Sequence, residues 1–489
     1  MALSVKFLGS TTLCLFISAV GAGLLSYPVA YRNQGIFFCV FFTLLFAYLI
    51  YTASLTMVQV AHLFKKEMVN NTFEELHYRA LGYRFWAIGT SSVLVGVFGA
   101  LVGFTIVIGD MLSPVLDDAF PDSVWSSRPF ILFTVTLCVA LPLSTIEHIH
   151  SLYLSSALSV ASVLVVAVAV GFQANASLND CPAAFSTSTF AAPANSDDDT
   201  TASTMPLVIF RLNAPYILLG IPISVFSLSS STQVVPLFLE LPSDQYSVFP
   251  IACCCSLASC VLLYLSTGFL GYLSFRDATA GDVLTNFPAT GTLSNLARSL
   301  LGIHVLLAYP LLLWPARRCI QSLLRPSSGA SSAPSSPPPP PSPFAVALGL
   351  VLSSTALAVL VPEVSVVFGL VGSIVGSWQA LIFPGFLMTK WGEASIGRGG
   401  EGGEKDEPLL PSGLYAETAD LKEVGPYNDL YSPEKRRAVW QTVGSKDFDG
   451  RLFLTRSGRY YVLFGRGLIA IGFVLMVLGT ADYVWATWL

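Results

Sequence analysis

The sequence predicts an all-α integral membrane protein with eleven transmembrane helices. First, 53% of the 489 residues are hydrophobic and only 11% are charged, whereas charged residues make up about a quarter of an ordinary soluble domain. Second, the chain contains eleven apolar runs, most of them near the length of about 20 residues that a helix needs to cross a bilayer. Third, two of these runs are interrupted by glycine, proline or serine, at places five runs apart.

The predicted spans form three groups that polar segments separate. Spans one to eight lie within residues 1–324, spans nine and ten within 344–390, and span eleven with a short tail within 460–489. A Pro- and Ser-rich linker (325–343) and a polar loop (391–459) lie between these groups. The predicted spans are 7–31, 36–62, 85–112, 129–143, 152–172, 214–239, 248–273, 296–314, 344–361, 364–387 and 460–484.

The Lys and Arg residues indicate which helix ends face the cytosol. With the N-terminus in the cytosol, 20 of the 25 Lys and Arg residues fall on the cytosolic side, as the positive-inside rule requires. The linker and the polar loop are then cytosolic, and the C-terminal tail lies outside. The sequon at Asn175, in a predicted loop after the fifth span, also lies outside, where an N-glycan could be attached.

The first predicted span contains an interruption. Gly21 and Gly23 sit in the middle of the run, and Pro28 follows about a turn later. Because lipid cannot hydrogen-bond freed backbone groups, a break here must face other protein or a water-filled cavity. The break is therefore a candidate binding site. The same glycines could instead serve only to let a neighbouring helix approach closely.

The sixth predicted span is interrupted in a similar way. Pro222 and Pro236 bracket the polar segment 226–232 in the middle of the run. Interruptions in spans one and six indicate two inverted five-helix repeats with the substrate between the broken helices. The positive N-terminal ends of half-helices favour an anionic group, and unwound carbonyls favour a cation. A zwitterion satisfies both.

Several segments resemble one transporter family. GAGLLSYPVAYRNQG, from Gly21, and IPISVFSLSSSTQVVPLFLEL, from Ile221, resemble the first and sixth helices of the amino acid/auxin permease family, whose members include sodium-coupled neutral amino acid transporters. Segments that start at Gly271, Tyr309 and Phe368 resemble later helices of that family. The resemblance implies a leucine-transporter-type fold, which is a 5+5 inverted repeat plus one extra helix, and coupled transport of amino acids.

The resemblance also implies a substrate site between the two interrupted spans. The backbone of the first span would line the site, and side chains of the sixth span would face it. A single serine in a helix often bonds to its own backbone, so the cluster of serines favours a pocket more than any one of them does. The expected substrate-binding residues are Gly21, Ala22, Gly23, Leu24, Phe226, Ser227, Ser229 and Ser230.

The coupling ion is expected to be a proton, with sodium as the alternative. Sodium-coupled members carry an Asn where this chain has Ile17. They also carry a Thr in the eighth helix, where this chain has Leu306, Ala308 and Tyr309. Hard cations need oxygen ligands, which these side chains lack apart from the Tyr309 hydroxyl, although backbone carbonyls could contribute. His304, which is ionisable and lies within a span, is the coupling candidate; a neutral hydrogen-bonded histidine is the alternative reading.

These observations predict a secondary active transporter of amino acids that works by alternating access. A non-transporting amino acid sensor, which would recruit a partner through the polar loop, is the alternative from another class. We expect no enzyme, because the sequence contains no catalytic motif of the metalloprotease or phosphate-loop type, and no metal site or cofactor, because the cysteines lack metal-binding spacing. The expected partners are an amino acid and the lipid bilayer, and no nucleic acid. A run resembling an acidic dileucine signal, at 406–410, adds an endosomal or vacuolar membrane to the plasma membrane as an expected location.

Overall fold

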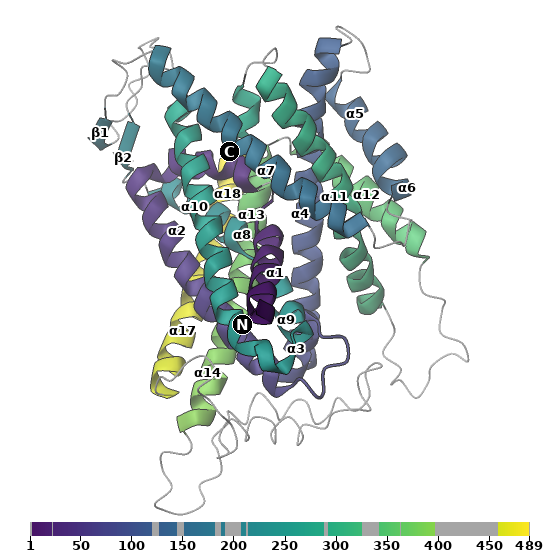
Figure 1. The fold of residues 1–489 in the computed structure, drawn as a ribbon, viewed down its shortest axis with the longest axis vertical. Helices are drawn as coiled ribbons and strands as arrows, with labels where there is room; N and C mark the ends of the chain where they lie inside the picture. The colour runs from purple at the N-terminus through teal and green to yellow at the C-terminus, as the bar shows by residue number, and fades with distance from the viewer. Residues whose placement is uncertain are drawn as a thin grey trace, which may run out of the picture.

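A computed structural model shows a mostly helical protein (Figure 1). The helices run mainly along the long axis of the molecule. The strands β1 (Thr187–Phe190) and β2 (Leu207–Phe210) and the C-terminus lie toward the top of Figure 1, and helix α3 (Phe73–Leu81) lies toward the bottom. The structure describes residues 2–21, 23–119, 127–143, 151–180, 187–190, 207–211, 214–287, 292–324, 342–361, 363–396 and 458–488.

The bundle consists of α-helices with several short π-helical segments. The α-helices other than α3 are α1 (Ala2–Ala19), α2 (Gly23–Leu63), α4 (Tyr83–Ala119), α5 (Arg128–Val135), α6 (Leu141–Leu143), α7 (Ser151–Asp180), α8 (Ala214–Leu228), α9 (Ser231–Glu240), α10 (Phe249–Phe275), α11 (Thr292–Leu324), α12 (Pro343–Leu360), α13 (Val364–Val371), α14 (Phe383–Ile396), α17 (Gly458–Val474) and α18 (Thr480–Trp488). The π-helical segments are η2 (Thr136–Ala140), η8 (Gly372–Gly376), η9 (Trp378–Ile382) and η12 (Leu475–Gly479).

Within the described residues, eight helices are long and apolar enough to cross a membrane. Three shorter apolar helices, Phe7–Ala19, Arg128–Ala140 and Val160–Ala176, fall within or close to predicted spans one, four and five. Helix α2 bends at Gly35, where φ is 78°, and so covers both the second half of span one and span two. The chain is therefore a polytopic integral membrane protein. The count of eleven crossings and the inverted repeat stay predictions.

Both interruptions that the sequence predicts are present. Val20 and Gly21 lie outside helices between α1 and α2, and Ser229 and Ser230 lie outside helices between α8 and α9. Each interruption leaves one helix end with free carbonyls and one with free N–H groups. Since lipid cannot satisfy these groups, the surrounding helices must shield them.

The segment between the fifth and sixth spans differs from its prediction in two respects. Helix α7 runs to Asp180, so Asn175 lies exposed on its last turns rather than in a loop; alanines at its end favour helix beyond the apolar run. The strands β1 and β2 form a small parallel sheet that the all-α prediction does not include. Phe210 of β2 contacts Phe37 of α2, with ring centroids 4.8 Å apart.

Most of the two cytosolic segments that the sequence predicts lies outside the described residues. Of the predicted linker, only residues 342 and 343 are described, at the start of α12. Of the predicted polar loop, residues 391–396 continue helix α14 and residues 458 and 459 begin α17. The membrane-proximal helices therefore extend past the predicted span ends.

Glycines allow the helices around the interruptions to approach closely. A Cβ at Gly268 of α10 would lie 2.8 Å from the ring of Tyr27 and 2.9 Å from that of Tyr31, both on α2. A Cβ at Gly372 of η8 would clash with the carbonyl oxygen of Pro222 in α8. Close packing therefore operates around both interrupted spans. Of the two glycines in the first interruption, Gly23 lies close to another helix, whereas nothing in the described residues lies within 4 Å of a Cβ added at Gly21.

Helix α3 lies outside the candidate spans and supports the π-helical segment η9. The buried His77 ring stacks on Phe383, with centroids 3.4 Å apart at 10°, and on Trp378, with centroids 6.3 Å apart. Its Nδ1–H donates a hydrogen bond of 2.9 Å to the carbonyl of Phe73. Burial lowers the pKa of His77 to about 3, because the apolar surroundings disfavour the charged ring.

We expect Gly372→Ala to lower the stability of the protein. The added methyl group would overpack the contact with Pro222, which typically costs about 1–3 kcal/mol. The midpoint of thermal unfolding in detergent measures this effect. Gly349→Ala on α12 is the matched control, because nothing lies within 4 Å of its added Cβ; its midpoint should stay the same or rise. Equal midpoints for the two variants would contradict the packing of η8 on α8.

The buried His77 should make stability fall as the pH drops below about 6.5. In this range the unfolded chain binds a proton at His77 and the folded protein does not, because its folded pKa is about 3. The loss amounts to about 2 kcal/mol at pH 5 and is absent above pH 7. His77→Phe should therefore reduce the difference between the unfolding midpoints at pH 7 and pH 5. An unchanged difference would show that His77 is protonated in the fold.

Candidate functional site

The two interruptions lie against each other inside the bundle. A Cβ at Gly23, the first residue of α2, would lie 2.5 Å from the hydroxyl oxygen of Ser227, near the end of α8. This contact requires a residue without a side chain on the first span and a small one on the sixth. The sequence supplies glycine and serine at these two positions, so the broken helices can meet.

A cavity of about 210 Å³ lies where the interruptions meet. Residues from α1, α2, α4, α8, α9, α10, α11, α13, η8 and η9 line it, so segments from most of the chain contribute. The described residues that line the cavity include no Asp, Glu, Lys, Arg or His. A bound molecule would therefore meet neutral side chains and the backbone.

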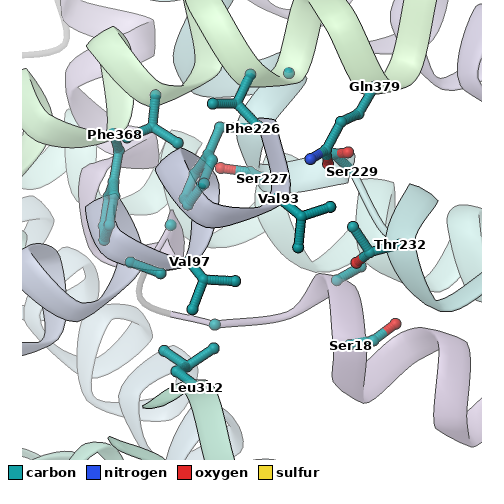
Figure 2. A pocket seen from close by; sticks show the side chains of 18 of the residues that line it. Ser18, Val93, Val97, Phe226, Ser227, Ser229, Thr232, Leu312, Phe368 and Gln379 are labelled. Carbon is teal, nitrogen blue, oxygen red and sulfur yellow. The ribbon is translucent and has the colours of Figure 1, made fainter. Parts of the chain in front are cut away.

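Polar side chains gather on one side of the cavity. Figure 2 shows the amide of Gln379 reaching from η9 toward Ser229, with Thr232 and Ser18 on the same side. The Ser227 hydroxyl is buried and has no hydrogen-bond partner within the described residues. Such a buried polar atom is costly unless a ligand or water satisfies it.

The other side of the cavity is apolar. The rings of Phe226 and Phe368 stack with centroids 4.8 Å apart at 18°, and Figure 2 shows Val97 and Leu312 on the same side. Aromatic rings and branched aliphatic side chains offer a surface for hydrocarbon. The cavity can thus hold a small molecule with a polar end and an apolar body.

Four helix ends converge on the cavity. The first residue of α2 (Gly23) and the second of α9 (Thr232) line it, and both helices present positive N-terminal ends there. The last residue of α1 (Ala19) and the next-to-last of α8 (Ser227) line it too, at the negative ends of these two helices. Ser230, which precedes α9, makes no side-chain cap. Carboxylate and ammonium groups would both find partners among these ends.

Most of the predicted substrate-binding residues reach the cavity. Gly21, Gly23, Phe226, Ser227 and Ser229 line it. Three others do not contribute in this way. Leu24 and Ser230 are buried beside the interruptions without lining the cavity, and Ala22 lies outside the described residues.

His304 does not line the cavity. It is buried on α11, with 6% of its surface exposed, and its Nδ1 has no hydrogen-bond partner within the described residues. Helix α11 packs along α4, which contributes Val93, Gly96 and Val97 to the cavity. Helix α11 also reaches the cavity itself through Leu312, so His304 is connected to the cavity through its own helix and through α4.

Sequence reasoning missed the contributions of α4, α10, α11, α13, η8 and η9. The sequence did contain a sign that Gln379 could belong to the site, because a polar amide in the middle of an apolar span is costly and often functional. It contained no such sign for Tyr264 of α10 and Val93 of α4, since apolar helices that pack on all sides show no pattern that tells which face lines a cavity.

The comparison with protein families decides the family of this chain. The family described as "Transmembrane amino acid transporter protein" matches residues 8–395. The chain belongs to the transmembrane amino acid transporter family. The match covers the chain from α1 to α14 and therefore includes both interruptions and the cavity.

Named members of the transmembrane amino acid transporter family are similar to this chain at modest identity. The amino acid transporter AVT6C of Arabidopsis thaliana is 27% identical over 394 residues, which are 76% of this chain and 83% of that protein. Solute carrier family 38 member 8 of Mus musculus is 24% identical, over 76% of this chain and 82% of that protein. Solute carrier family 38 member 10 of Homo sapiens is 26% identical, over 76% of this chain but 31% of its own length.

We expect Gln379→Leu to weaken the binding of an amino acid to the cavity. Losing one hydrogen bond between neutral groups typically costs about 0.5–1.5 kcal/mol, which is up to about tenfold in Kd. The stabilisation of the purified protein by added amino acids measures the change. Ser377→Ala is the control, because Ser377 is buried two residues away and does not line the cavity. Equal weakening in both variants would exclude a direct role of the Gln379 amide.

Proposed function

We propose that this protein is a secondary active transporter that moves amino acids across a membrane by alternating access. The observation that carries the proposal is the cavity between the two interrupted spans. Its neutral lining and its four helix ends suit a zwitterion. Among the similar proteins, AVT6C is named an amino acid transporter and a Xenopus laevis protein a putative sodium-coupled neutral amino acid transporter, which supports the same substrate class.

The proposal includes the leucine-transporter-type arrangement of two inverted five-helix repeats plus one helix. Eight long apolar helices and three shorter ones are compatible with eleven crossings. The interruptions fall in predicted spans one and six, which are the corresponding helices of the two repeats. Rocking of one repeat against the other around the cavity would expose the substrate to each side in turn.

The amino acid would lie with its charged end at the interruptions and its side chain toward the aromatic pair. Its carboxylate would accept hydrogen bonds from the N–H groups at the starts of α2 and α9. Its ammonium group would donate to carbonyls at the ends of α1 and α8. The hydroxyl of Ser227 and the amide of Gln379 would bind either end or a polar side chain.

We propose a proton as the coupling ion, with sodium as the alternative. Ile17 and Ala308 provide no side-chain oxygen at the places where sodium-coupled relatives carry one. His304 is the proposed proton carrier, since it is the imidazole buried in the helix that packs on α4. The proposed orientation has a cytosolic N-terminus and linker, an outer C-terminus and an outer Asn175. The plasma membrane and an endosomal or vacuolar membrane are the proposed locations.

Uptake of labelled amino acids into proteoliposomes tests the function. A proton gradient alone should drive accumulation, and a sodium gradient alone should not. Gly23→Trp should reduce uptake to the level of empty liposomes, because its side chain would fill the cavity. Gly349→Trp is the control, since nothing lies within 4 Å of a Cβ at Gly349.

Three results would contradict parts of the proposal. Accumulation that sodium alone drives would overturn the proton assignment and leave the site in place. Saturable binding of an amino acid without flux under either gradient would favour the sensor over the transporter. Equal uptake by wild type and Gly23→Trp would place the substrate elsewhere.

A further inference from the structure

The hydroxyl of Tyr264 occupies the free end of helix α1. Tyr264 lies on α10, is fully buried, and donates a hydrogen bond of 2.9 Å to the carbonyl oxygen of Ala19. Ala19 is the last residue of α1, and both residues line the cavity. The side chain of another helix thus satisfies a carbonyl that the interruption leaves without an intrahelical partner.

A carbonyl at this position would otherwise attract a cation. The last carbonyls of a helix carry the negative end of its dipole. In interrupted membrane helices such carbonyls coordinate the coupling cation. A hydroxyl hydrogen supplies the same kind of partner, a partial positive charge at hydrogen-bonding distance. The Tyr264 hydroxyl therefore compensates part of the charge that would bind sodium there.

The Tyr264 ring is held so that its hydroxyl must point at α1. It stacks on Tyr27 of α2, with centroids 5.0 Å apart at 19°. The Tyr27 hydroxyl is fixed in turn by a 2.6 Å hydrogen bond to that of Thr43. Gly268, one turn after Tyr264, leaves the room that Tyr27 fills. Tyr264 thereby connects α10 with both halves of the first span, by stacking on α2 and by a hydrogen bond to α1.

Helix α1 packs mainly on α10, and at its end Val20 is buried in the core. Leu15 is buried, but Leu13 is 50% exposed and Cys14 is exposed as well. The second half of the span, in α2, is instead buried almost completely from Gly23 to Tyr31. The hydrogen bond at Ala19 adds to the packing of α1 on α10 at the residue where the helix ends.

We propose that Tyr264 is a positioning residue that replaces a cation at the end of α1, so that substrate binding does not require sodium. This inference rests on the proposed transport function and deepens it. The hydroxyl holds the end of α1 against α10 and completes the cavity wall. Without it, the Ala19 carbonyl would need another partner, and sodium would be able to supply it.

The chain offers a closely matched control for Tyr264→Phe. Tyr272 lies two turns further along α10, is equally buried, and stacks on Tyr31 of α2 with centroids 6.3 Å apart at 18°. Its hydroxyl accepts a hydrogen bond of 3.2 Å from the backbone N–H of Val208, away from the cavity. Tyr272→Phe therefore removes the same atom from a similar ring stack without touching α1.

The test measures uptake into proteoliposomes under a proton gradient, in sodium chloride and in choline chloride. Wild type and Tyr272→Phe should show the same KM in both salts. Tyr264→Phe should raise KM about tenfold in choline chloride, the size expected for one lost hydrogen bond, and sodium chloride should lower it again. A merely structural role would raise the KM of Tyr264→Phe equally in both salts and would overturn the proposal. An unchanged KM in Tyr264→Phe would also overturn it, and so would uptake by the wild type that requires sodium.

A second measurement does not depend on transport. Hydrogen–deuterium exchange of peptides covering residues 15–24 should be faster in Tyr264→Phe than in wild type or Tyr272→Phe, and sodium chloride should slow it in Tyr264→Phe alone. Unchanged exchange, or exchange that ignores sodium, would overturn the assignment of Tyr264. Absence of amino acid binding and flux in wild type would overturn the proposed function, while the exchange result would still decide whether Tyr264 substitutes for a cation.

Discussion

The structure depends on one constraint, that backbone groups freed within a bilayer must find partners inside the protein. Two interruptions create four helix ends in the middle of the bundle, and each end frees about four such groups. They are tolerable only because they lie against each other, with Gly23 packed on Ser227, and because α10 sends the Tyr264 hydroxyl to the end of α1. The remaining unsatisfied polarity faces the cavity. The candidate binding site thus consists of the polar groups of the two interruptions that no other described part of the protein satisfies.

Close helix packing keeps this site small. Gly268 lets two tyrosines of α2 lie on α10, and Gly372 lets η8 touch the backbone of α8 at Pro222. Behind η9, the buried His77 of α3 stacks on the ring of Phe383. The cavity wall is therefore supported from outside the spans as well as within them. A wall built from backbone contacts has little freedom to adapt, which favours selection of substrates by size.

The sequence predicts the interruptions well and the cavity wall only in part. Glycine, proline and serine within apolar runs are local signals, so Gly21, Gly23 and the segment 226–232 could be found without a structure. The choice of wall residues from α4 and α10 depends on helix rotation, which uniformly apolar helices do not encode. His304 could be recognised as an ionisable residue within an apolar span. For the same reason as above, the sequence could not show that it does not line the cavity. The end of α7 and the small sheet lie beyond the apolar runs, where hydropathy gives no guidance.

The two adjoining π-helical segments, η8 and η9, have a consequence for how selectivity can change over evolution. A π-helical turn accommodates one residue more than an α-helical turn, so each segment is a place where the chain can lose or gain a residue without breaking the helix. Such a change rotates the following residues by about 100° about the helix axis. Deleting one residue before Gln379 would turn its amide away from the cavity and bring Ala380 into its place. Changes in length, and not only substitutions, can therefore exchange the side chain that a substrate meets.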